Sequence, residues 1–199
     1  MCLPHNETAT SRPAVELDLD EAQDMFATNV FGVVNINQTF LPQLHIAKGT
    51  TVNIGSVAGH LPLPFHSVYC ASKAALYAYC ECLRVELAPL GVKVTYVNTG
   101  SVRTNLSRGL THLREDSLFA PISKEFEQRQ EEAAMSGMDP AEFAKHFAQQ
   151  ILRGHSNVLW IGENAFMVRM LNALENYLPL RIFPLIFSKL YKLEKLKAH

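Results

Sequence analysis

A tyrosine and a lysine stand four positions apart in the stretch HSVYCASKAALYAYC, at Tyr69 and Lys73. If this stretch is helical, the two side chains lie one turn apart on the same face. A phenol, with a pKa of about 10, exchanges protons poorly near neutral pH, and a neighbouring ammonium group favours the phenolate. Such a tyrosine can give a proton to the alkoxide that forms from a ketone, or take one from an alcohol. The pair therefore predicts proton transfer at a carbonyl group.

The same spacing recurs at Tyr191 and Lys195, so the surroundings of the first pair have to distinguish it. Ser56 stands thirteen residues before Tyr69, near the end of a stretch that predicts a buried strand. A hydroxyl at that place can hold the carbonyl oxygen of a substrate. Because no side chain supplies a hydride, the reaction calls for a nicotinamide cofactor.

Strands and helices are expected to alternate along the chain. Short stretches rich in β-branched and apolar residues predict buried strands at 50–57, 92–98 and 157–162. Helices are predicted from Asp18 towards Leu44, from an N-cap at Ser67 to Pro89, over 122–135, and from an N-cap at Asp139 to Arg153. This order predicts an α/β fold with parallel strands and right-handed crossovers, which binds ligands beyond the carboxyl ends of its strands.

The composition narrows the class of protein. A length of 199 residues fits one domain with a sizeable core, and a net charge of -1 argues against a nucleic-acid partner. The four cysteines form no C-x-x-C pair and have no histidine at zinc spacing, which predicts small buried thiols and no metal site. Without a basic-then-apolar leader pattern, we expect a cytoplasmic protein in a reducing compartment.

Four motifs occur in an order and at distances that resemble the short-chain dehydrogenase/reductase family. They are NVFG at 29–32, GSVAG at 55–59, YCASK at 69–73 and NTGSVRT at 98–104, the last with Thr99 where the family usually has proline. The resemblance covers residues 18 to about 162. It implies that Tyr69 is the proton donor or acceptor and that Ser56 orients the substrate oxygen.

The resemblance also implies how a nicotinamide cofactor is held. Lys73 would lower the pKa of Tyr69 and bind the nicotinamide ribose. Asn29 would keep a water in the proton relay through a local distortion of its helix. The backbone of Val102 and the side chain of Thr104 would contact the nicotinamide carboxamide, so that Asn29, Tyr69, Lys73, Val102 and Thr104 together form the cofactor-binding set.

A Rossmann domain normally opens with a strand, a glycine-rich turn and a helix that takes the pyrophosphate. The chain contains no G-x-x-x-G-x-G, and no strand is predicted before Asp18. We therefore expect the C-terminal part of a doubly wound parallel-sheet Rossmann fold that lacks the first βαβ units. It would form a single partial domain over 1–199, with a core at 18–162, a lid at about 105–138 and an amphipathic tail at 163–199. Its strand at 50–57 should have an unpaired edge.

Two functions stay open for such an N-terminally truncated chain. One is an oxidoreductase that reduces a ketone or oxidises a secondary alcohol. The other is a catalytically inactive interaction module. It would dimerise, with itself or with a full-length relative, through the helices that carry Asn29 and Tyr69, as many family members do.

YCASKAALYAY and the tail also resemble fungal acyl-dihydroxyacetone-phosphate reductases and their relatives in biosynthetic pathways. This resemblance implies NADP(H) rather than NAD(H) and a small lipophilic carbonyl or alcohol substrate, of lipid or secondary metabolism. The apolar runs of the tail are too short to span a bilayer. Apolar and basic residues alternate there, from Leu180 and Arg181 to Lys197. They suit either an interfacial helix at an ER or lipid-droplet surface, or a final helix packed near the substrate mouth.

Overall fold

The computed structural model describes residues 10–104, 111–154, 157–177 and 182–198. Its centre is a parallel sheet of β1 (Thr50–Ile54), β2 (Lys93–Thr99) and β3 (Val158–Ile161), in the order β1-β2-β3. Ile54 of β1 pairs with Val97 of β2, and Tyr96 of β2 pairs with Val158 of β3. The predicted α/β fold with parallel strands is confirmed. Within the described residues β1 is an edge strand of this sheet, as expected.

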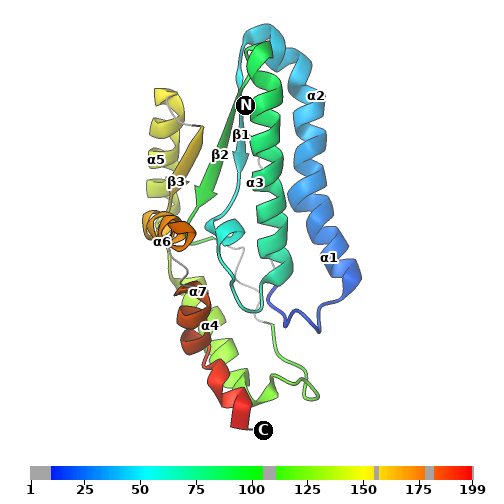
Figure 1. The fold of residues 1–199 in the computed structure, drawn as a ribbon, viewed down its shortest axis with the longest axis vertical. Coiled ribbons are helices and arrows are strands. Elements are labelled where there is room, and N and C mark those ends of the chain that lie inside the picture. The colour runs from blue at the N-terminus through cyan, green and yellow to red at the C-terminus, as the bar shows by residue number, and fades with distance from the viewer. Residues whose placement is uncertain (1–9, 105–110, 155–156, 178–181, 199) are drawn as a thin grey trace.

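Helices cover both faces of the sheet. On one side α1 (Leu19–Phe26), a π-helical turn η1 (Ala27–Phe31) and α2 (Gly32–Ala47) form one rod beside α3 (Ser67–Leu87), as Figure 1 shows. On the other side lies α5 (Pro140–Arg153). A three-residue 3-10 turn, Ala88–Leu90, and Gly91 in the left-handed region end α3 before β2 begins.

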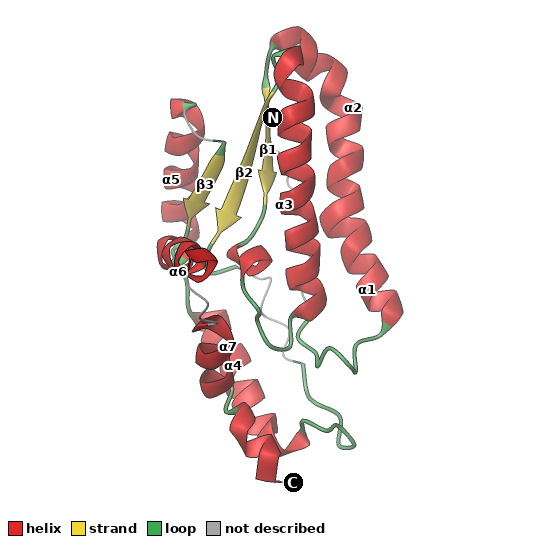
Figure 2. Ribbon diagram, in the orientation of Figure 1, coloured by secondary structure: helices red, strands yellow, loops and turns green. Residues whose placement is uncertain are grey.

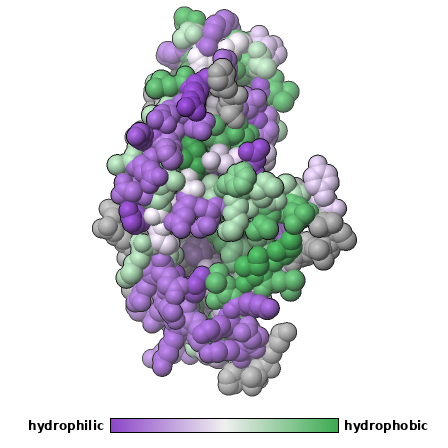
Figure 3. All heavy atoms as spheres, turned by 90° about the vertical axis from the view of Figure 1, so that its left-hand side faces the viewer, coloured by the Kyte–Doolittle hydropathy of each residue, from purple (hydrophilic) through white to green (hydrophobic). Residues whose placement is uncertain are grey.

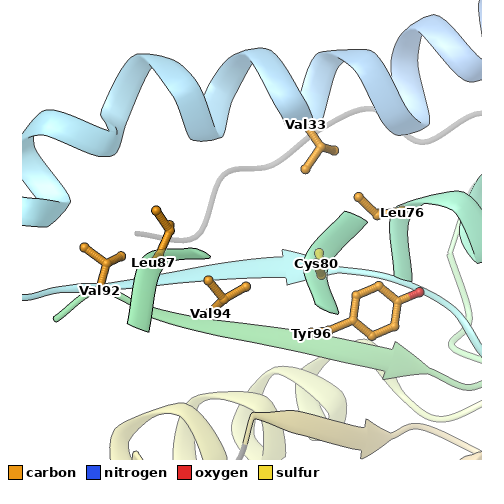
Figure 4. Packing of buried hydrophobic residues seen from close by; sticks show 7 residues of the cluster. All are labelled: Val33, Leu76, Cys80, Leu87, Val92, Val94 and Tyr96. Carbon is orange, nitrogen blue, oxygen red and sulfur yellow. The ribbon is translucent and has the colours of Figure 1, made fainter. Parts of the chain in front are cut away.

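The alternation of side chains along β2 divides the core between these two layers. Val94 and Tyr96 point towards α3 and α2, where they pack with Leu76, Cys80 and Val33 (Figure 4). Val97 points the other way and packs with Val52, Leu159, Ile161 and the phenylalanines of α5, Phe143 and Phe147. The short apolar strands are therefore buried on both faces, which is why they carry almost no alternation in the sequence.

Two sequence-based predictions were wrong in detail. Ser67 is the first residue of α3 and makes no capping hydrogen bond; His66 occupies the N-cap position, with its ring bonded to Ser11 and to the carbonyl of Pro64. Cys82, which we expected to be a buried thiol, is exposed, although Cys80 on the same helix is buried. Neighbours two apart on a helix face different sides, so one of the two must point outwards.

The C-terminal half adds helices at the carboxyl end of the sheet. Below the strands in Figure 2, α4 (Ser123–Met135) lies close to α7 (Ile182–Leu190) and a final 3-10 segment, Leu193–Ala198. Tyr191, Leu193 and Leu196 pack there against Phe65, Ile122 and Phe126. In the chain, α6 (Ala165–Tyr177) follows β3 and precedes α7. No helix among the described residues is long and apolar enough to cross a membrane.

Candidate active site

Tyr69 and Lys73 lie one turn apart near the start of α3, as their spacing predicts. The Lys73 side chain is completely buried and Tyr69 is nearly so. The Lys73 Nζ lies 5.6 Å from the centroid of the Tyr69 ring, within reach of a favourable cation–π contact. The lysine amine thus lies beside the phenol, where a positive charge favours the phenolate.

Ser56 reaches the same place from the carboxyl end of β1. The strand ends at Ile54, three residues before the predicted end at 57, and the N–H of the following Gly55 donates to the carbonyl of Val97. Ser56 then caps a short 3-10 helix, η2 (Val57–His60), and its Oγ accepts the N–H of Ala58 at 3.1 Å. Ala58 packs with Tyr69, so the serine loop lies against the helix of the Tyr–Lys pair.

The two glycines of GSVAG are needed because neighbouring groups approach both positions too closely to leave room for a side chain. A Cβ on Gly55 would lie 1.9 Å from the ring of Tyr96, and a Cβ on Gly59 would lie 3.0 Å from the backbone of Lys73. A larger residue at 55 would collide with Tyr96, and one at 59 would push the serine loop away from α3. The motif is therefore explained by packing, one glycine on each side of the serine.

Asn29 lies in the π-helical turn η1, so the predicted distortion of its helix is confirmed. The asparagine is fully buried, and its Nδ2 donates to the Oγ of Ser72 at 3.2 Å. Ser72 in turn donates to the carbonyl of Tyr69 at 2.8 Å. This chain of hydrogen bonds ties the distorted helix to the turn of α3 that carries the Tyr–Lys pair.

Tyr96 is a positioning residue that sequence reasoning missed. Its hydroxyl accepts the N–H of Ser56 at 3.4 Å and donates to the carbonyl of Lys73 at 3.3 Å, so it bridges the serine loop and α3. The residue is fully buried. A tyrosine in a buried strand requires a hydrogen-bond partner for its hydroxyl, and this requirement was the available signal.

The segment after β2, which carries Val102 and Thr104, is held by two neighbouring loops. Ser101 pairs with Glu163 beyond β3, and Val102 pairs with Met138 before α5. A Cβ on Gly100 would lie 2.2 Å from the carbonyl oxygen of Glu163, so only glycine permits this contact. Val102 is thus fixed through its backbone, whereas the Thr104 side chain is exposed at the end of the segment. Of the predicted lid, residues 105–110 lie outside the described residues.

Comparison with known proteins shows to which family this chain belongs. The model of the short chain dehydrogenase family matches residues 3–115, which is more than half of the chain. The chain belongs to the short-chain dehydrogenase family. Its Asn, Ser, Tyr and Lys motifs all lie within the matched part.

Two fungal proteins are similar to this chain over different lengths. The chain is 36% identical over 191 residues to the short-chain dehydrogenase srdE of Neurospora crassa, covering 94% of this chain and 64% of that protein. It is 42% identical over 120 residues to the NADPH-dependent 1-acyldihydroxyacetone phosphate reductase of Schizosaccharomyces pombe. This similarity covers 57% of this chain and 40% of that protein. The chain therefore spans less than two thirds of the length of these two relatives.

A solved short-chain dehydrogenase from Streptomyces avermitilis has the same fold, with a TM-score of 0.70 and 27% identity. The similarity covers 99% of this chain and 68% of that one.

The short-chain dehydrogenase site in this chain fits the nicotinamide half of a dinucleotide. At the carboxyl end of β2 the Nδ2 of Asn98 and the Oγ1 of Thr99 are buried with no hydrogen-bond partner among the described residues, which suits a polar group bound there.

Proposed function

We propose that the protein is an NAD(P)(H)-dependent oxidoreductase that reduces a ketone or oxidises a secondary alcohol. The observation that carries this proposal is the buried Lys73 ammonium 5.6 Å from the ring of Tyr69. The positive charge favours the deprotonated phenol, which makes Tyr69 able to exchange a proton with the substrate oxygen.

Ser56 positions that oxygen. Because its Oγ already accepts the N–H of Ala58, its hydroxyl hydrogen is left to be donated to a carbonyl oxygen. Such a donor stabilises the negative charge that develops on the oxygen during reduction. Tyr69 delivers the proton and Ser56 holds the oxygen, and the two side chains come from packed elements.

When bound, the nicotinamide supplies or accepts the hydride at the substrate carbon. Lys73, beside Tyr69, is proposed to bind its ribose, and Asn29 to keep a water in the proton relay. The backbone of Val102 and the side chain of Thr104 are proposed to contact its carboxamide. NADP(H) is favoured over NAD(H), because the relative from Schizosaccharomyces pombe is NADPH-dependent.

The proposed substrate is a small lipophilic carbonyl compound or alcohol. The same relative reduces an acyl-dihydroxyacetone phosphate. In this chain the loop before α3 carries Phe65, which packs edge-on against Phe119 and Phe126 of the proposed lid. An aromatic boundary next to the helix of Tyr69 suits an apolar substrate.

Steady-state oxidation of NADPH and NADH with a ketone tests this function, and the chain contains its own control. Tyr69→Phe removes the proton donor and is expected to reduce kcat by 10²–10⁴-fold, roughly the contribution of acid–base catalysis. Tyr191→Phe alters the other Tyr-x-x-x-Lys pair and is expected to keep activity. Equal turnover by the wild type and Tyr69→Phe would refute the proposal.

The second candidate is an inactive module that dimerises or pairs with a longer relative. It is favoured by the edge strand β1 and by exposed apolar side chains on the helices of that side, Phe31, Ile46 and Val85. Stable co-purification with a full-length family member, combined with no cofactor binding by the isolated chain, would support this candidate over the enzyme.

A further inference from the structure

The outer face of α6 is apolar, which is unusual for a helix on the surface of a protein. Ala165 and Val168 of this helix are buried in the core. At about 100° per residue, its large apolar side chains that point to solvent all fall within an arc of about 100°. They are Phe166, Met167, Met170, Leu174 and Tyr177, of which Phe166 is 68% exposed and Tyr177 is 88% exposed.

Helix α7 extends this surface. Its Phe183 is buried, whereas Leu185, Ile186 and Leu190 are exposed. Figure 3 shows hydrophobic atoms gathered over α6 and α7 on the face that is turned to the viewer. We call these eight exposed residues the α6–α7 face: Phe166, Met167, Met170, Leu174, Tyr177, Leu185, Ile186 and Leu190.

A hydrogen bond holds the two helices together. The Oε1 of Glu175 on α6 accepts the N–H of Phe183 at 2.8 Å, in the first turn of α7. A carboxylate at a helix N-terminus satisfies a donor without a partner in the helix and interacts favourably with the helix dipole. This bond joins the end of α6 to the first turn of α7, so the two apolar surfaces follow one another along the chain.

The charges on these two helices favour an anionic partner. Arg169 and Lys189 are exposed and lie next to the apolar side chains. Glu175 is the only acidic residue of α6, and it is engaged by Phe183; α7 contains none. Lysine and arginine can lay their apolar stems along such a face while their charged ends reach lipid headgroups.

We propose that the α6–α7 face docks the protein on an anionic lipid surface, lying in the plane of the interface. A second copy of the chain is disfavoured as the occupant, because a two-fold contact places the same patch against itself. Such a contact would bring the cations Arg169 and Lys189 of both copies into one interface, with the single carboxylate of each α6 already used. The proposal does not rest on the proposed reaction.

Co-sedimentation with vesicles tests the proposal on the 199-residue chain. The wild type is expected to bind vesicles of phosphatidylcholine with phosphatidylserine more tightly than pure phosphatidylcholine, and binding should weaken as salt is raised. The triple variant Phe166→Ser/Met170→Ser/Leu174→Ser is expected to lose roughly tenfold or more in affinity, because three apolar side chains no longer enter the interface. Arg169→Gln/Lys189→Gln should remove most of the preference for phosphatidylserine.

A matched control uses exposed apolar residues on other helices. Leu19→Ser/Met135→Ser/Leu152→Ser changes side chains of α1, α4 and α5 that are more exposed than the three α6 residues, and it is expected to bind vesicles like the wild type. Thermal unfolding followed by circular dichroism shows that each variant is folded. Wild-type protein that stays in the supernatant with both vesicles, or a triple α6 variant that binds unchanged, would overturn the proposal. So would sedimentation velocity showing that the α6 variant only converts a dimer into monomers.

Discussion

The Nε2 of His60 lies 2.8 Å from the Oδ1 of Asn98, and this hydrogen bond joins the loop of Ser56 to the carboxyl end of β2. The imidazole packs between Tyr77 and Trp160, with ring centroids 5.0 and 5.1 Å away. Asn98 directly precedes the segment that carries Val102. His60 therefore connects the loop proposed to hold the substrate oxygen with the segment proposed to contact the nicotinamide.

Stability should fall below neutral pH because of His60. Burial lowers the pKa of His60 from its ordinary value of 6.5, although the bond to Asn98 partly opposes this. As pH falls below about 6.5, the unfolded chain takes up a proton that the native state resists, so the free energy of unfolding decreases. His60→Gln keeps a hydrogen-bond donor but does not titrate, and it is expected to flatten this dependence in urea unfolding measured across the window.

His146→Gln, at an exposed position of α5, is the control and should leave the slope unchanged. The slope that remains in His60→Gln is expected to come from His66, whose pKa is also lowered by burial. An identical pH dependence in His60→Gln and the wild type would contradict the assignment.

Removing the hydroxyl of Tyr96 should affect both stability and turnover. Tyr96→Phe leaves the N–H of Ser56 and the carbonyl of Lys73 without this bridge, which is expected to cost about 1–3 kcal/mol in the free energy of unfolding. Because the serine loop is then less firmly placed against α3, kcat should fall on the order of tenfold while the KM for NADPH changes little. Tyr177→Phe, at an exposed tyrosine, should match the wild type; a stable Tyr96→Phe enzyme with full kcat would limit Tyr96 to packing.

The parts of the site that the sequence predicted are local. The four-residue spacing of Tyr69 and Lys73 places them on one helix face whatever packs around it. The distortion at Asn29 came from a family motif, and η1 confirms it. The three strands were predicted correctly because short runs of β-branched and apolar residues favour a buried strand over a helix.

What could not be predicted depends on contacts between distant segments. His60 and Asn98 are 38 residues apart, and Ser56 and Tyr96 are 40 apart. The pattern of the tail likewise does not say which apolar residues of α6 face the core, so Phe166 and Tyr177 are recognised as exposed only in three dimensions. The wrong N-cap at Ser67 has the same origin, since His66 is fixed by Ser11, far away in the sequence.

The hydrogen bond between Asn29 and Ser72 should show energetic coupling. Asn29→Ala and Ser72→Ala each remove one partner of a buried pair and are expected to cost about 1–3 kcal/mol. The double variant should cost less than the sum, by about 0.5–3 kcal/mol, because the second substitution finds no bond left to break. The double-mutant cycle is obtained from the free energies of unfolding in urea of the wild type, the two single variants and the double variant. Asn35→Ala, at an exposed position of α2, should not couple to Ser72→Ala, and an additive Asn29/Ser72 cycle would mean that the bond contributes nothing.

Gly55→Ala should disrupt the site through a collision with one side chain. The added Cβ would meet the Tyr96 ring at 1.9–2.4 Å, so either the ring or the serine loop has to move, at about 1–3 kcal/mol in stability and with a loss of turnover. Gly49→Ala is the control, because the tightest contact of its Cβ would be the flexible end of the Leu44 side chain, at 3.2 Å. If the Tyr96 ring is the cause, Gly55→Ala should cost much less when it is made in a Tyr96→Val background. An equal cost in both backgrounds would show that Gly55 is needed for the path of the backbone and not for the room it leaves to Tyr96.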